Sequence, residues 1–306
     1  MPRTVWNRFF IAMALITSVA LLIWIAGSKV TAQSTTSGEW TASLSSKDSK
    51  LQLNMERRST KAGRNQMGQT FEFSDFQGLT AQQVQAGGPV SFSLVREAGR
   101  IDFEGSFQNG KGSGTFRFTP NLGFVSAMKS RGFDFEQSSR SDDDREGEDR
   151  LFAATALNVT TALADDLSSA GFGKLQTEDL FKAAIFKINS QFMREMKASG
   201  FQNLGMEELV KARIFKIDAD FVRQVSQMGF DKEPFETLVK MQIFKVTPEF
   251  VTEMRNEGLT NIQIEDLVKL RIFKIDTEFI RAAKADGVPL DVERLVQRKI
   301  GVARRE

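Results

Sequence analysis

The sequence predicts an α+β protein in which an antiparallel β domain, either an open sheet or a small barrel, precedes an α-solenoid of two-helix repeats. Short runs of alternating apolar and polar residues between 38 and 119 predict the β domain. A 29-residue internal repeat predicts the solenoid. Its clearest mark is a series of evenly spaced glycines: Gly171, Gly200, Gly229, Gly258 and Gly287. We therefore divide the 306-residue chain into segments 1–33, 38–119 and 120–306.

Residues 1–33 have the pattern of an export sequence. Arg3 and Arg8 precede nineteen uncharged residues, 9–27, and the small residues 30–32 come before Gln33. The pattern fits a cleaved secretory signal peptide, and the uncharged run is also long enough for an uncleaved membrane anchor. Both interpretations place residues 34–306 outside the cytoplasm, either free in the periplasm or anchored to the inner membrane.

The segment 38–119 contains six short runs in which every second residue is apolar, as in half-buried strands. In one of them Leu51, Leu53 and Met55 share a face, and polar residues occupy the other. The runs lie at 40–44, 51–56, 71–73, 92–94, 101–107 and 116–118. Asn109-Gly110 predicts a hairpin turn, and the capping-box spacing of Thr80 and Gln83 predicts a short helix. One apolar face predicts an antiparallel sheet, which is either closed into a barrel or covered by another element.

The segment 120–306 repeats a unit of two short helices. Ile-Phe-Lys recurs at 185–187, 214–216, 243–245 and 272–274, and a residue suited to an N-cap follows each time. These N-cap residues are Asn189, Asp218, Thr247 and Asp276. Units begin at Leu151, Leu180, Leu209, Leu238 and Leu267, with a half-unit from Leu295. The residues 136–150, which interrupt the period, are predicted to form an acidic loop.

Two sets of lysines follow the same period, and we name them for their predicted positions. The helix lysines are Lys182, Lys211, Lys240 and Lys269, and the junction lysines are Lys187, Lys216, Lys245 and Lys274. Acidic residues accompany them at 178, 207, 236 and 265. One interpretation is a solvated face with ion pairs between units, each worth about 0–1 kcal/mol. The other is a ridge that binds an acidic protein or an acidic polymer of the cell envelope.

Other candidate sites carry weaker signals. Residues 105–111 have the spacing of a phosphate-binding loop, but a strand pattern follows where a helix is needed, so we predict a plain hairpin. Asp102 and Glu104 share a strand face and could form a glycosidase-type carboxylate pair, although a solvated strand face is the simpler interpretation.

Parts of the chain resemble a known family. Residues 38–42, 89–99 and repeats such as Ile-Phe-Lys-Val-Thr-Pro-Glu-Phe-Val at 243–251 resemble the extracytoplasmic region of bacterial membrane proteins of the Bla-regulator, antirepressor metallopeptidase type. The resemblance covers about residues 38–306 and does not extend to a peptidase, because the chain has no His-Glu-x-x-His motif. It implies a stand-alone sensor or interaction region.

The amino-acid composition excludes several classes of functional site. The chain has no Cys, His or Tyr, which excludes disulfides, thiolate nucleophiles, imidazole ligands and Ser-His-Asp machinery. We predict no cofactor, metal site or catalytic residue, and no enzyme activity. The net charge of +2 falls to about −1 without the three cations of residues 1–33, which gives no basis for binding nucleic acid.

The predicted function is therefore a non-enzymatic scaffolding or sensor module of the cell envelope, which binds a partner along the repeats through the eight lysines. The membrane would be a further partner if residues 1–33 are retained. A β domain that binds a small lipid or glycan, with the repeats as a spacer, is the alternative. A carboxylate-based hydrolase is a third hypothesis.

Overall fold

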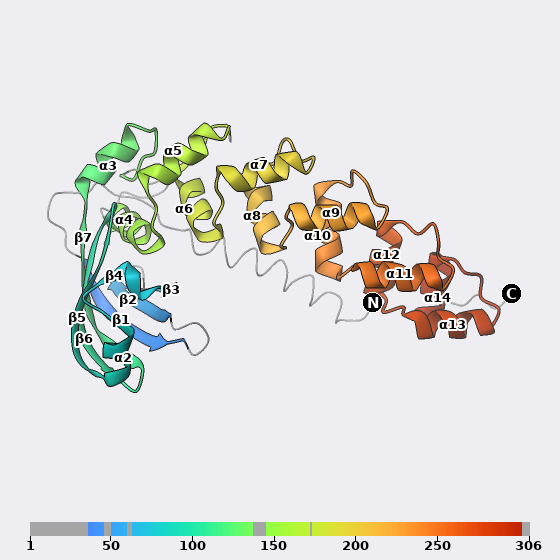
Figure 1. Ribbon diagram of the computed structural model, residues 1–306, viewed down its shortest axis with the longest axis horizontal. Coiled ribbons are helices and arrows are strands. Elements are labelled where there is room, and N and C mark those ends of the chain that lie inside the picture. Colours follow the sequence, from blue (N-terminus) through green and yellow to red (C-terminus); the bar gives the residue numbers. More distant parts are fainter. Residues whose placement is uncertain (1–35, 46–49, 60–62, 137–144, 172, 302–306) are drawn as a thin grey trace. The chain divides into compact units, whose positions relative to one another are not determined.

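The computed structural model describes residues 36–301 except 46–49, 60–62, 137–144 and 172 (Figure 1). It confirms the predicted α+β fold class, with an antiparallel sheet followed by consecutive helices. The predicted signal or anchor lies outside the described residues, and no helix within them is long and apolar enough to cross a membrane. Strands give way to helices near residue 120, as predicted, but the described chain divides into compact units later, into 36–187 and 188–301.

The first unit contains a seven-stranded antiparallel sheet with the strand order β3-β2-β1-β7-β6-β5-β4. The strands are β1 (Thr36–Leu44), β2 (Leu51–Ser59), β3 (Gly63–Phe71), β4 (Phe76–Gln77), β5 (Gly88–Arg96), β6 (Gly99–Gln108) and β7 (Lys111–Pro120). The outermost strands β3 and β4 do not pair with each other in the described residues, so the sheet curls into an open half-barrel (Figure 1).

The inner face of the curled sheet is filled by its own apolar side chains. Trp40 is 1% exposed and packs edge-on against Phe92, with ring centroids 5.5 Å apart, while Phe92 stacks on Phe103 at 4.7 Å. The indole N–H of Trp40 donates to the carbonyl oxygen of Glu104 at 3.1 Å. Alternation puts these residues inside and polar residues outside, as period-two patterning predicts.

Two strands differ from the prediction. The run at 71–73 is the end of β3 followed by the 3₁₀ turn η1 (Phe73–Asp75), and most of β3 and all of β4 were not expected. The sequence of residues 63–70 lacks apolar alternation because β3 is an edge strand, in which Gln66 and Thr70 are exposed. The predicted helix near Thr80 is confirmed as α2 (Ala81–Ala86), with its capping box to Gln83. Asn109 and Gly110 both have positive φ in the predicted hairpin turn.

Helices follow the sheet in pairs, and the equivalent leucines that start the predicted units are at most 1% exposed. The helices are α3 (Leu122–Lys129), α4 (Arg145–Leu157), α5 (Thr161–Ser169), α6 (Thr177–Phe186), α7 (Ser190–Ala198), α8 (Met206–Ile214), α9 (Ala219–Gln227), α10 (Phe235–Phe244), α11 (Pro248–Asn256), α12 (Ile264–Ile272), α13 (Thr277–Ala285) and α14 (Val292–Lys299).

The acidic loop predicted at 136–150 is shorter than expected, since α4 already begins at Arg145. Residues 137–144 lie outside the described residues. Apolar packing favours the helix here, because Phe152 of α4 stacks on Phe116 of the sheet, with centroids 5.4 Å apart. A buried cation then fixes α4 to α6: Arg150 donates to Glu178 at 2.6 Å and to the carbonyl oxygen of Asp134 at 3.3 Å.

Each helix pair of the second unit is bounded by the predicted caps. Side chains of Asp218, Thr247 and Asp276 accept hydrogen bonds from the backbone N–H three residues later, at 2.9–3.3 Å. The second helix of each pair ends at a glycine with positive φ, for example Gly229 at 86° and Gly287 at 75°. The N–H after each of these glycines bonds five residues back, which is the Schellman pattern.

Candidate partner-binding surface of the helical repeats

The helix lysines are engaged in ion pairs. In the second unit Lys211 pairs with Glu236 and Lys240 with Glu265, both at 2.7 Å, and Lys269 pairs with Glu293. Each pair joins the middle of one first helix to the first turn of the next first helix. In the first unit Lys182 pairs with Asp179 at 3.2 Å on its own helix. The ammonium groups of this row are therefore paired with neighbouring carboxylates, and those of Lys211, Lys240 and Lys269 tie consecutive repeats together.

The junction lysines differ in both backbone and side chain. All four have left-handed backbone, with φ of 54° at Lys187, 55° at Lys216, 54° at Lys245 and 52° at Lys274. Each follows the first helix of its unit, at the position that usually takes glycine in a Schellman motif. The following N–H bonds five residues back, as in the 2.8 Å bond from Ile217 to the carbonyl of Ala212. A non-glycine residue in this conformation costs about 1–2 kcal/mol.

The side chains of these lysines project into solvent. Lys216, Lys245 and Lys274 are exposed, and no ion pair or hydrogen bond of their ammonium groups is found among the described residues. Beside each lysine the two preceding residues, Ile and Phe, are only partly buried, and Ile243 is 37% exposed. We call the three Ile-Phe-Lys segments 214–216, 243–245 and 272–274 the junction edge of the second unit.

Consecutive junctions lie next to each other along the repeats. The Nε2 of Gln242, on α10, donates to the carbonyl oxygen of Lys216 in the preceding junction at 3.5 Å. The ion pairs of the helix lysines hold α8, α10, α12 and α14 in the same order. The three junctions thus follow one another along one compact unit.

Two phenylalanines of the second helices, Phe192 and Phe250, belong to the core, and each has an arginine over its ring. The guanidinium of Arg213 lies 3.6 Å from the ring centroid of Phe192, and that of Arg271 lies 3.7 Å from that of Phe250. Burial lowers the pKa of the Arg271 guanidinium from its ordinary value. These two arginines contribute to the packing of the repeats through their contacts with the rings.

One buried carboxylate predicts a specific pH dependence of stability. Glu257, with a side chain 9% exposed, accepts from Arg281 at 2.6 Å and pairs with Lys284 at 3.2 Å. The hydrogen bond from Arg281, followed by that from Lys284, lowers the pKa of Glu257, while burial opposes the shift. A carboxyl whose pKa is lowered by folding stabilises the fold above its unfolded pKa, about 4.3, and loses that contribution as the pH falls through the folded value.

We therefore expect Glu257→Gln to lower the melting temperature of the second unit at about pH 7 and to have a much smaller effect at about pH 3. Calorimetric scans at both pH values measure this difference. Glu278→Gln, at an exposed carboxylate without an ion pair among the described residues, is the control and should change little at either pH. An equal loss for Glu257→Gln at both pH values would contradict the assignment.

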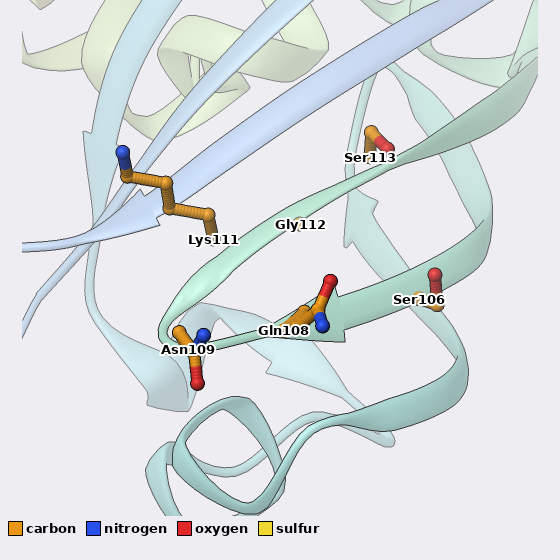
Figure 2. A pocket seen from close by; sticks show the side chains of 6 residues that line it. All are labelled: Ser106, Gln108, Asn109, Lys111, Gly112 and Ser113. Carbon is orange, nitrogen blue, oxygen red and sulfur yellow. The ribbon is translucent and has the colours of Figure 1, made fainter.

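The other candidate residues form no cleft. Asp102 accepts from Ser93 and from Arg100, both at 2.7 Å, on the outer face of the sheet, and Glu104 is exposed on that face. The turn at 109–110 borders an open hollow of about 460 Å³, whose polar lining comes from one hairpin (Figure 2). As Figure 2 shows, Ser106, Gln108 and Lys111 are strand and turn residues, so the phosphate-loop spacing is that of a hairpin, as predicted.

Comparison with known proteins provides no further assignment: the chain matches no described protein family, no characterised protein and no solved structure.

Proposed function

We propose that the protein is a non-enzymatic binding or scaffolding module of the cell envelope, and that it binds an acidic partner along its helical repeats. The observation that carries the proposal is the row of exposed junction lysines at Lys216, Lys245 and Lys274, which have no ion-pair partner in the part of the chain that the structure describes. Repetition alone requires only a residue that tolerates left-handed backbone. Asn158, at the equivalent position of the repeat that begins at Leu151, has φ of 57° and meets that requirement without a charge.

Charge complementarity sets the chemistry of the partner. The carboxylates closest in sequence to the junction lysines are Asp218 and Asp276, which accept from helix N–H groups at 2.9 Å and so are already stabilised. The middle junction has Thr247 instead, which leaves the charge of Lys245 least offset. An acidic protein or envelope polymer fits this surface. The export pattern of residues 1–33 and the resemblance to extracytoplasmic sensor regions support an envelope location.

The inner face of the sheet does not favour the ligand-binding alternative. Trp40, Phe92 and Phe103 of this face pack against one another and are at most 2% exposed, and Phe76, beside them, is 7% exposed. Similarly, the hydrogen bonds of Asp102 and the exposed position of Glu104 give no support to a carboxylate-based hydrolase. The repeats therefore carry the proposal.

Charge reversal at the two lysine rows tests the proposed function. We expect the full chain in detergent to bind poly-L-glutamate, and Lys216→Glu/Lys245→Glu/Lys274→Glu to weaken binding at least tenfold and flatten its salt dependence. The matched control, Lys211→Glu/Lys240→Glu/Lys269→Glu, reverses the row that is already paired and should weaken binding less. Circular dichroism checks that both variants fold.

Fluorescence anisotropy at increasing salt measures both quantities. Failure of the wild-type chain to bind poly-L-glutamate, or equal losses in the two variants, would overturn the proposal.

A further inference from the structure

The junction edge of the second unit combines charge with apolar surface in a fixed order. Each lysine follows a half-buried phenylalanine and a partly exposed isoleucine, so every junction offers one cation beside an apolar patch. Soluble proteins expose isolated apolar residues without consequence, but here the same partly exposed pair is repeated three times along one unit. A small inorganic anion would use the cations and leave the apolar part unused.

The packing of the repeats sets the spacing of the cations. The helices α8, α10 and α12 are joined in succession by the ion pairs of Lys211 and Lys240. Neighbouring packed helices lie about 8–10 Å apart, so equivalent junction lysines are about 10 Å apart. A polyproline II segment rises about 3.1 Å per residue, so three of its residues span about one repeat. A polyproline II segment also has three residues per turn, which would place every third side chain on the same face.

We infer that the junction edge binds an extended acidic segment of another protein, with a carboxylate on every third residue and apolar residues between the carboxylates. In this arrangement each carboxylate pairs with one of Lys216, Lys245 and Lys274. The intervening apolar side chains lie against the isoleucine and phenylalanine of each junction. The inference rests on the proposed function and specifies the partner class of the same surface.

A pair of synthetic peptides tests the spacing. The first peptide repeats Glu-Leu-Pro, so that glutamates recur on every third residue of an extended chain. The second has the same composition, with its glutamates gathered at one end. We expect the full-length protein to bind the first peptide at least tenfold more tightly than the second. Equal affinity would overturn the inference, because charge alone would then explain binding.

Two single variants test the apolar contribution. Ile243→Ser, at a junction residue that is 37% exposed, should weaken binding of the first peptide about fivefold or more and leave binding of poly-L-glutamate unchanged. Val95→Ser, at an apolar residue of the first unit that is 41% exposed, is the matched control and should change neither. Unchanged binding of the first peptide by Ile243→Ser would also overturn the inference.

The experiments distinguish failure of the proposed function from failure of the extended-segment inference. If the protein binds poly-L-glutamate but does not distinguish the peptides, the proposed function stands and the extended-segment inference falls. If it binds neither poly-L-glutamate nor either peptide, both fall.

Discussion

Trp40→Ala is expected to lower the free energy of unfolding of the first unit by about 3–5 kcal/mol, the usual cost of removing a large buried aromatic side chain. Trp40 is 1% exposed and its ring lies 5.5 Å from those of Phe92 and Phe107. In the sheet it pairs with Gly114, which pairs in turn with Gly105, and the indole lies against Gly105. Alanine would leave a cavity there and orphan the Glu104 carbonyl that the indole N–H now satisfies.

Differential scanning calorimetry measures this loss as a fall in melting temperature on the order of 10 °C for the transition of the first unit. Trp40→Phe keeps most of the ring packing and loses the hydrogen bond, so its effect should be clearly smaller. Gly114→Ala provides an independent check, since an added Cβ would collide with the Glu104 carbonyl oxygen. If Trp40→Ala and Gly114→Ala both melt like the wild type, the described core is incorrect.

Replacing the three junction lysines of the second unit by glycine is expected to stabilise that unit. Lys216, Lys245 and Lys274 have φ of 52–55°, a conformation that glycine adopts without steric cost. Each replacement should gain about 1 kcal/mol, and the triple variant Lys216→Gly/Lys245→Gly/Lys274→Gly about 2–3 kcal/mol. Urea unfolding followed by circular dichroism measures the gain.

The matched control makes the opposite substitution, glycine to lysine, at the glycine that follows a second helix. Gly287 has φ of 75°, and a Cβ there would meet nothing within 4 Å, so Gly287→Lys isolates the conformational cost of lysine. It should lose about 1 kcal/mol. The prediction would be contradicted if the triple variant were less stable than the wild type and Gly287→Lys had no effect on stability. In that case the junction lysines would stabilise the fold.

The fold was predictable where side-chain periodicity reports burial. Leu51, Leu53 and Met55 alternate because one face of β2 is buried, and the prediction held for this strand. The repeats were predictable because Asp218 and Thr247 cap helices at a fixed spacing, and both caps form. The edge strand β3 was missed because its polar sequence carries no burial pattern. The start of α4 at Arg145 was missed because Phe152 fixes it through contact with distant strands.

The candidate surface was only partly predictable. The 29-residue repeat identified both rows of lysines and showed that Glu236 and Glu265 recur with them. It did not show which row forms ion pairs with these glutamates. That depends on the stacking of α10 and α12, which brings Lys240 within 2.7 Å of Glu265. The left-handed backbone of the junction lysines was also missed. Asn158, at the equivalent position, was the available signal, since asparagine adopts this conformation more readily than most residues.

The central claim is that the junction lysines serve a partner and not the fold. Its most direct test is the affinity of Lys216→Gly/Lys245→Gly/Lys274→Gly for the Glu-Leu-Pro peptide, measured by isothermal titration calorimetry on the same preparation used for urea unfolding. We predict that this variant is more stable than the wild type and binds the peptide at least tenfold more weakly. A variant that binds the peptide as tightly as the wild type would contradict the claim.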